Sequence, residues 1–266
     1  MQLFTPLVVN REAPLARANP IAKLASAFAL MTVLLASIDP VTPALILVVL
    51  LVGVPLTGLS ARTLVARAWP ILALALAIGL VNVLFGEQRG GELVRIGPVS
   101  IASGTALTGV GLGLRLVGVA LAGLVAVAAT EPIDLADALI SQLGFSPRFA
   151  VGALAAVRLL PALAEERQTI ALARRARGLE AGRSPLAAIR LAGGQLFGLL
   201  VAAVRRGTRL ALAMEARGFG ARQCRTVARP QRMRRSDWAL IGIAIALAAA
   251  AILVGIAAGT WRPLWG

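Results

Sequence analysis

Five long apolar stretches constrain the fold of this chain more than any other feature of its sequence. A helix needs about 20 mostly apolar residues to cross the roughly 30 Å hydrocarbon core of a bilayer. The stretches that qualify cover residues 21–38, 41–59, 69–86, 106–130 and 238–261. Composition agrees, because 58% of the 266 residues are hydrophobic and only 15% are charged. The sequence therefore predicts an all-α membrane protein with about five transmembrane helices.

The segment between the fourth and fifth apolar stretches has a different character. Residues 131–237 carry 18 arginines against 8 acidic residues, and the charges recur too often for a membrane span. Such helices are amphipathic and lie along a membrane surface or against protein. We expect one short helix at 134–143 and two long ones at 147–177 and 185–217, the first of them kinked or broken at Pro161.

This division predicts three regions. They are an N-terminal transmembrane region of four spans (1–130), a cytoplasmic region (131–237) and a C-terminal span (238–266). Short loops rich in arginine and lysine stay on the cytoplasmic side. The cations before the first span, between the second and third, and in the cytoplasmic region all fall on one side if the N-terminus is cytoplasmic. We therefore expect a multi-pass protein of a prokaryotic cell membrane, with its N-terminus inside.

Charge and residue usage exclude several functions. The net charge of +15 would suit nucleic acid, but the basic region has few aromatic residues and is interleaved with apolar helix faces, so we expect a lipid bilayer and no nucleic acid as partner. The chain has no histidine and one cysteine, Cys224, which rules out an internal disulfide, a His/Cys metal site and a Ser-His-Asp triad. No cofactor or metal site and no catalytic residue is predicted.

A tripeptide occurs at the end of each long helix of the cytoplasmic region. The two copies are Ala176-Arg177-Gly178 and Ala216-Arg217-Gly218. Glycine enters the left-handed conformation without steric cost, so each copy reads as a last helical turn, an exposed cation and a stop. Two interpretations remain open at this point. The tripeptides form a matched pair of docking ends, or they are ordinary helix ends in an arginine-rich chain.

The second long helix has two further features. Arg206, Arg209 and Arg217 fall on one side of a helical wheel and predict a cationic stripe leading to its end. Its apolar residues Leu196, Phe197 and Leu200 form a separate group suited to a membrane or an apolar partner.

The fourth apolar stretch contains many glycines and one arginine. Small residues let helices approach closely in lipid, so the glycines predict a packing seam with a neighbouring span or a partner. Arg115, near the middle of this stretch, has either a functional role or a snorkelling or re-entrant position.

Several motifs resemble one known family, the transmembrane T component of energy-coupling factor transporters, which includes the cobalt-transport permease CbiQ. Asn19-Pro20-Ile21-Ala22-Lys23-Leu24 resembles the Asp-Pro-x-x-Lys-Leu element near the first span of that family, with asparagine in place of aspartate. The stretch from Arg158 through Pro161 to Glu165-Glu166 resembles its Arg-x-x-Pro-x-x-x-Glu-Glu element. The stretch from Ala213 to Phe219 resembles its second Ala-Arg-Gly signature.

The resemblance implies a scaffold that couples energy and is not itself an enzyme. In that family the two long helices cross, and each Ala-Arg-Gly end inserts into a groove on one of two ATPase subunits. ATP and Mg are bound by those partner ATPases, and a small membrane S component binds the substrate, a vitamin or a transition-metal ion. By resemblance, residues 176–178 and 216–218 dock the ATPases, and Leu196, Phe197 and Leu200 face the S component or membrane.

Two alternatives stand beside this interpretation. In the first, the chain is the permease subunit of an ordinary ABC importer, although such a subunit usually brings a single coupling site. In the second, it is a membrane enzyme acting on lipid, for which Asp134-Leu135-Ala136-Asp137 is the only candidate carboxylate pair for Mg²⁺.

Overall fold

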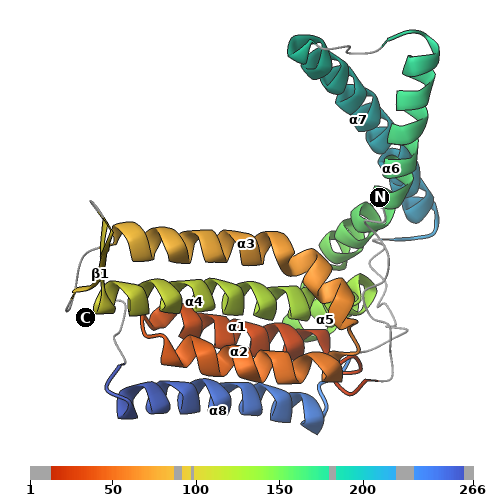
Figure 1. Cartoon of the computed structure of the whole chain (residues 1–266). Helices are drawn as coiled ribbons and strands as arrows, with labels where there is room; N and C mark the ends of the chain where they lie inside the picture. Colours follow the sequence, from red (N-terminus) through yellow and green to blue (C-terminus); the bar gives the residue numbers. More distant parts are fainter. Residues whose placement is uncertain (1–12, 87–91, 97–98, 180–183, 220–230, 261–266) are drawn as a thin grey trace. The chain divides into compact units, whose positions relative to one another are not determined.

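The computed structural model describes residues 13–86, 92–96, 99–179, 184–219 and 231–260 (Figure 1). The chain forms two compact units. One combines Thr5–Ala138 with Gln231–Gly266 and is called the bundle unit here; the other, which includes Leu139–Pro230, is inserted into it and is called the insertion unit. The helix α5 (Pro132–Leu143) covers the boundary where the chain passes from the first to the second.

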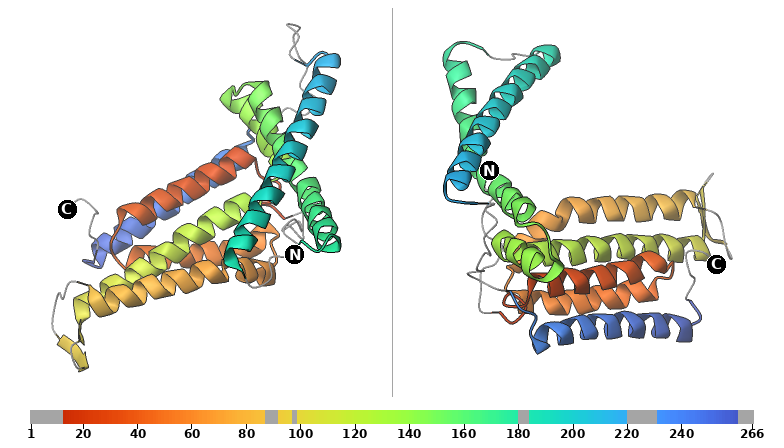
Figure 2. Two further views of the ribbon diagram at one scale, coloured as in Figure 1. Left: turned by 90° about the horizontal axis from the view of Figure 1, so that it is seen from above. Right: turned by 180° about the vertical axis from the view of Figure 1, so that it is seen from behind.

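The bundle unit consists of long helices lying side by side (Figures 1 and 2). Its elements are α1 (Pro20–Ala36), α2 (Val41–Gly53), the 3-10 helix η1 (Val54–Thr57), α3 (Ala61–Phe85), α4 (Ser103–Ala128) and α8 (Arg235–Ala257). The helix α4 packs against α1, α2 and α3, and α8 packs against α1 and α2. The predicted all-α membrane fold is confirmed, and each predicted span corresponds to one of these helices.

By length and composition, five helices of the described part of the chain can cross a membrane. They are α3 (from Ala68), α4 (from Gly104), α6, α7 and α8. The helices α1 and α2 are apolar but shorter, and the two long helices of the insertion unit meet the criterion although they carry more charge. Five spans were predicted and five helices meet the criterion. The two sets differ, because α6 and α7 meet it in place of the predicted α1 and α2.

A tight polar turn joins α1 to α2. Asp39 lies in this turn, and its Oδ2 accepts hydrogen bonds from the backbone N–H and the hydroxyl of Thr42, both at 2.7 Å. The carboxylate thus caps the first turn of α2, where backbone N–H groups have no partner within the helix. Asp39 and Thr42 are both buried, so this cap forms part of the interior of the bundle unit.

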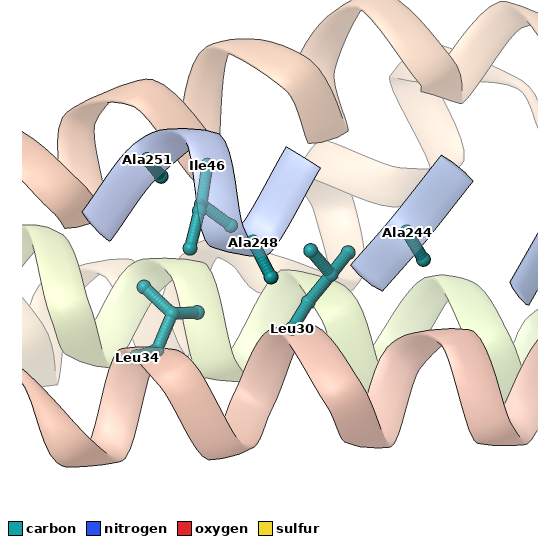
Figure 3. Close-up of a cluster of buried hydrophobic side chains, with 6 residues drawn as sticks. All are labelled: Leu30, Leu34, Ile46, Ala244, Ala248 and Ala251. Atoms are coloured by element: carbon teal, nitrogen blue, oxygen red, sulfur yellow. The ribbon is translucent and has the colours of Figure 1, made fainter. Parts of the chain in front are cut away.

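One of the hydrophobic core clusters of the bundle unit forms where α8 lies against α1 and α2. Figure 3 shows Leu30 and Leu34 of α1 and Ile46 of α2 in one cluster with three alanines of α8. The alanines are Ala244, Ala248 and Ala251, which lie on one side of the helix because they are spaced three or four positions apart. Their small side chains let α8 approach its neighbours closely, which is the main route to helix packing in lipid.

Glycines of α4 form the predicted packing seam. A Cβ at Gly109 would lie 2.8 Å from the carbonyl oxygen of Gly79 on α3, and one at Gly113 would lie 3.5 Å from the carbonyl oxygen of Ala75. On α4 toward α1, a Cβ at Gly118 would lie 3.1 Å from the side chain of Leu34. The seam therefore joins α4 to two neighbouring spans, α1 and α3, which confirms the expectation of close packing.

A short hairpin lies in the loop that precedes α4. Its strands β1 (Glu92–Ile96) and β2 (Val99–Ala102) pair antiparallel, with Ile96 opposite Val99 and an irregularity between Glu92 and Val94. These strands were not predicted from the sequence, because two strands this short leave only a weak alternating pattern. The helix α3 begins at Ala61, before the span predicted from Trp69. Its first two turns contain Arg62 and Arg67, and the span was predicted from apolar residues alone.

The insertion unit contains two long helices, α6 (Pro147–Ala176) and α7 (Pro185–Ala216). Each begins with a proline at its first position and a serine immediately before it. Pro161 lies within α6 and does not end it, so of the predicted kink or break the break does not occur. The helices contact each other in antiparallel order, because Glu166 of α6 meets Arg206 of α7 while Arg174 meets Leu191. The basic segment 221–236, which follows α7, lies mostly outside the described residues.

Candidate functional site

The helices α6 and α7 end in the same local structure. Gly178 and Gly218 adopt left-handed φ angles of +72° and +77°. After α6, Leu179 N–H donates to the Arg174 carbonyl at 3.0 Å and Gly178 N–H to the Arg175 carbonyl at 2.9 Å. This pair of bonds is the Schellman motif, which satisfies the last carbonyls of a helix.

The end of α7 repeats the arrangement. Phe219 N–H donates to the Met214 carbonyl and Gly218 N–H to the Glu215 carbonyl, both at 2.9 Å. The residue at the helix cap is arginine in both cases, Arg177 and Arg217, with similar φ and ψ angles. The two Ala-Arg-Gly tripeptides are therefore alike in backbone geometry as well as in sequence.

Both tripeptides are exposed along their whole length, Ala176 through Gly178 and Ala216 through Gly218. A Cβ at either glycine would meet no atom within 4 Å. Among the described residues, neither Arg177 nor Arg217 makes an ion pair or side-chain hydrogen bond. Two guanidinium groups, each with five donors in a planar fork, are thus presented at two separate helix ends.

The predicted apolar contact residues also lie at the surface. Leu196, Phe197 and Leu200 are 67%, 68% and 60% exposed. These three residues belong to the middle of α7 and are not brought to either Ala-Arg-Gly end. Contiguous exposed apolar side chains are typical of surfaces that contact lipid or another protein.

The predicted cationic stripe on α7 is not a free surface. Arg209 and Arg217 are exposed, but Arg206 turns to α6 and forms an ion pair with Glu166, with Nη2 2.6 Å from Oε2. A helical wheel places a side chain on a face of its own helix but does not show which neighbouring helix covers that face. This ion pair was therefore not predicted, although Glu166 belongs to the Arg158–Glu166 motif.

The motif at the start of α1 has a structural role that its residues explain. Asn19 caps the helix, because its Oδ1 accepts from Ile21 N–H at 2.9 Å. Lys23 is buried, and its ammonium group donates to the carbonyls of Ala16 and Ala129, both at 2.8 Å. Ala129 directly follows α4, so the lysine joins the start of α1 to the end of α4.

A second contact ties the same motif to α8. The backbone N–H of Asn19 donates to Oδ1 of Asp237 at 2.9 Å, and Oδ2 of Asp237 accepts from Arg234 N–H at 2.8 Å. Asp237 is buried and lies in the first turn of α8, where a carboxylate is favoured by the helix dipole. The start of α1 thus holds both the end of α4 and the start of α8. This role of Asp237 was not predicted from the sequence.

Arg115 of α4 makes a structural contact with α1 inside the bundle unit. Its Nη2 donates to the carbonyl of Leu35, one of the last carbonyls of α1. Those carbonyls have no partner within the helix, and a cation at a helix C-terminus is electrostatically favourable. Arg115 therefore caps α1 from the middle of α4.

No metal-binding cluster is found where the structure describes the chain: no three His, Cys, Asp or Glu side chains are grouped to hold an ion. The fold and the site define a multi-pass membrane protein whose inserted helical unit presents two matched basic ends. Comparison with known proteins identifies its family. The chain belongs to the CbiQ family, described as cobalt transport protein, whose model matches residues 11–227.

Individual relatives agree with this assignment. The chain is 26% identical to the energy-coupling factor transporter transmembrane protein EcfT of Exiguobacterium sibiricum, over 91% of this chain and 96% of the relative. It is 31% identical to EcfT 1 of Listeria monocytogenes, over 70% of this chain and 72% of the relative. A third relative, named putative ABC transporter ATP-binding protein, comes from Bifidobacterium longum; it is 27% identical over 91% of this chain but only 31% of its own length.

The chain is thus a transmembrane component of an energy-coupling factor transporter and a multi-pass bacterial membrane protein. It is a transport component and not an enzyme, so the alternative of a lipid-modifying enzyme is set aside.

Proposed function

We propose that this chain couples ATP hydrolysis to substrate import by docking two ATP-binding cassette ATPase subunits on the ends of α6 and α7. In this proposal residues 176–178 engage one ATPase and residues 216–218 the other. The main support is the pair of identical, exposed, arginine-bearing helix ends. A lone end of this kind is ordinary, whereas two with the same cap, the same residues and the same exposure suit two copies of one kind of groove.

The chemistry of each end suits a groove lined by acceptors. Alanine keeps the last turn narrow, and the left-handed glycine turns the chain away, so that the arginine side chain projects. Its guanidinium binds a carboxylate or helix-end carbonyls through two parallel hydrogen bonds. Because Arg177 and Arg217 have no ion pair among the described residues, no internal contact has to be broken before docking.

ATP and Mg are bound by the partners in this proposal. The chain has no Gly-x-x-x-x-Gly-Lys-Ser/Thr sequence, which is the phosphate-binding loop of such ATPases. The Bifidobacterium longum relative supports the partnership, because a stretch similar to this chain accounts for 31% of a protein named as ATP-binding.

We further propose that a separate small membrane S component binds the transported substrate, a vitamin or a transition-metal ion. The description of the family names cobalt, but this chain has no histidine and lacks a ligand cluster within its described residues. The exposed Leu196, Phe197 and Leu200 form the proposed contact with the S component or the membrane. The N-terminus and the insertion unit are assigned to the cytoplasm, because arginine-rich segments remain there.

The proposal is tested by replacing Arg177, Arg217 or both by alanine and measuring affinity for the ATP-binding cassette subunits of the same genome. Truncating an arginine that is desolvated in a groove costs about 2–5 kcal/mol, which is roughly 30-fold or more in affinity. Exposed arginines elsewhere change it by less than about 1 kcal/mol. Arg190→Ala and Arg205→Ala are matched controls, since both residues are exposed on α7 away from its end.

We expect each single variant to weaken ATPase binding and the double variant to abolish both binding and ATP-driven uptake. A purified complex should contain one copy of this chain for two ATPase subunits, which separates it from a permease of an ordinary ABC importer. A double variant that binds the ATPases and transports normally would refute the proposal.

A further inference from the structure

Three polar contacts join the C-terminal part of α6 to the middle of α7. The carboxylate of Glu166 pairs with Arg206 at 2.6 Å. Two side chains reach backbone carbonyls of the other helix: Gln195 Nε2 donates to the Arg167 carbonyl at 2.8 Å, and Arg174 Nη1 donates to the Leu191 carbonyl at 2.7 Å. These contacts span residues 166–174 of α6 and 191–206 of α7.

The ion pair has a symmetrical position relative to the two helix ends. Glu166 precedes Arg177 on α6 by the same number of positions as Arg206 precedes Arg217 on α7. At a rise of about 1.5 Å per residue, each end is about 17 Å along its own helix from the pair. Because the helices are antiparallel, the two ends lie in opposite directions from this point.

We propose that the Glu166–Arg206 ion pair sets the crossing of α6 and α7 and thereby the spacing of the two Ala-Arg-Gly ends. This inference rests on the proposed docking function and assigns positioning residues to it. Two ends that enter two ATPase subunits together need a defined separation. The helix pair α6 and α7 keeps that separation only if the two helices do not slide or rotate against each other.

The composition of the contact explains why an ion pair is needed there. At Gly198 the nearest neighbour of a Cβ would be the end of Ile170 at 3.8 Å, and at Gly194 it would be the Arg174 guanidinium at 3.2 Å. Small residues allow a close approach but do not fix a register, since they offer few interlocking side chains. In the part of α7 that the structure describes, no residue is fully buried, so apolar packing alone holds α6 and α7 together weakly. A charged pair together with two side-chain-to-backbone hydrogen bonds supplies the missing geometric specificity.

The neighbouring residues provide a matched control. Glu165 and Arg205 carry the same charges and directly precede the two members of the pair, and both are exposed. Within the described parts of the chain they form no ion pair. Exchanging the charges of Glu165 and Arg205 changes the amino-acid composition as much as exchanging those of Glu166 and Arg206. It leaves the ion pair at the crossing of α6 and α7 intact.

The test compares Glu166→Arg, Arg206→Glu and the double variant that exchanges the two charges. Spin labels at Ala173→Cys and Ala213→Cys, in a background with Cys224→Ser, report the spacing of the helix ends by pulsed electron paramagnetic resonance on the full chain in lipid nanodiscs. Both alanines are exposed, and each lies in the turn that precedes the arginine of its own helix end.

We expect either single reversal to shift or broaden the distance distribution, because it replaces attraction by repulsion. In the assembled transporter it should raise the ATP hydrolysed per substrate imported several-fold, a range typical of coupling between sites. The double exchange should restore both quantities, and the Glu165→Arg with Arg205→Glu control should change neither. A purely stabilising role would lower the melting temperature of the single reversals without shifting the distance distribution or the coupling of the folded protein.

Two results would overturn the inference: wild-type distances in both single reversals, or a double exchange that is as disturbed as they are. Where a reversal does not yield folded protein, Glu166→Gln removes the charge alone and should still broaden the distribution. The outcome is separable from the docking proposal. If the wild-type chain does not bind the ATPases, the docking function fails. If Arg177→Ala weakens binding while Glu166→Arg leaves the distance and the coupling unchanged, only the positioning role fails.

Discussion

The glycines of the two helix ends give a prediction whose sign depends on backbone conformation. Gly178 and Gly218 have φ angles of +72° and +77°, whereas Gly152 of α6 and Gly207 of α7 lie within helices and have no positive φ. At all four positions an added Cβ would meet no atom within 4 Å. Steric contact is therefore the same in each case, and replacement by alanine tests conformation alone.

Two opposing contributions set the free-energy change when alanine replaces glycine at a helix end. A residue with a Cβ in the left-handed region costs roughly 1–2 kcal/mol. Alanine also restricts the unfolded chain, which returns about 0.4–1 kcal/mol. The net loss at either helix end is therefore about 1 kcal/mol, or some fivefold in the equilibrium for opening of the end. Within the helices the same change should stabilise by about 0.5–1 kcal/mol, since glycine is unfavourable there.

Hydrogen exchange measures this opening directly. The Leu179 amide is held by the Arg174 carbonyl and the Phe219 amide by the Met214 carbonyl. We expect Gly178→Ala and Gly218→Ala to speed exchange at these amides about fivefold. Gly152→Ala and Gly207→Ala should leave it unchanged or slower. If all four variants change exchange in the same direction, the conformational argument is wrong.

Two further predictions concern the bundle unit. The buried ammonium of Lys23 binds the Ala129 carbonyl. Lys23→Met should therefore lower the free energy of unfolding by about 2 kcal/mol, because the buried Ala129 carbonyl loses its donor. Thermal melting in detergent measures this, and an unchanged melting temperature would contradict it. A Cβ at Gly109 would lie 2.8 Å from the Gly79 carbonyl oxygen, whereas one at Gly53 would meet no atom within 4 Å. Gly109→Ala should accordingly cost about 1–3 kcal/mol through overpacking, and Gly53→Ala is the control that should not lower the melting temperature.

Much of the local structure could be predicted from the sequence. Apolar length located α1, α2, α3, α4 and α8, and proline and glycine marked the ends of α6 and α7 closely. These features depend on residues close together in the chain, so the local sequence pattern is enough to predict them. Boundaries failed where the signal was not apolar, as in the arginine-bearing first turns of α3 and the short hairpin before α4.

The partners of the polar side chains were decided by tertiary structure. Asn19 and Asp237 lie near opposite ends of the chain, and Glu166 and Arg206 are joined across two helices. Arg115, which the sequence left between a functional and a snorkelling role, binds a carbonyl of α1. Each of these contacts depends on how far one helix is rotated and shifted against another. Hydrophobic periodicity fixes which face of a helix is apolar but not that shift, so only the packed structure shows which charges meet.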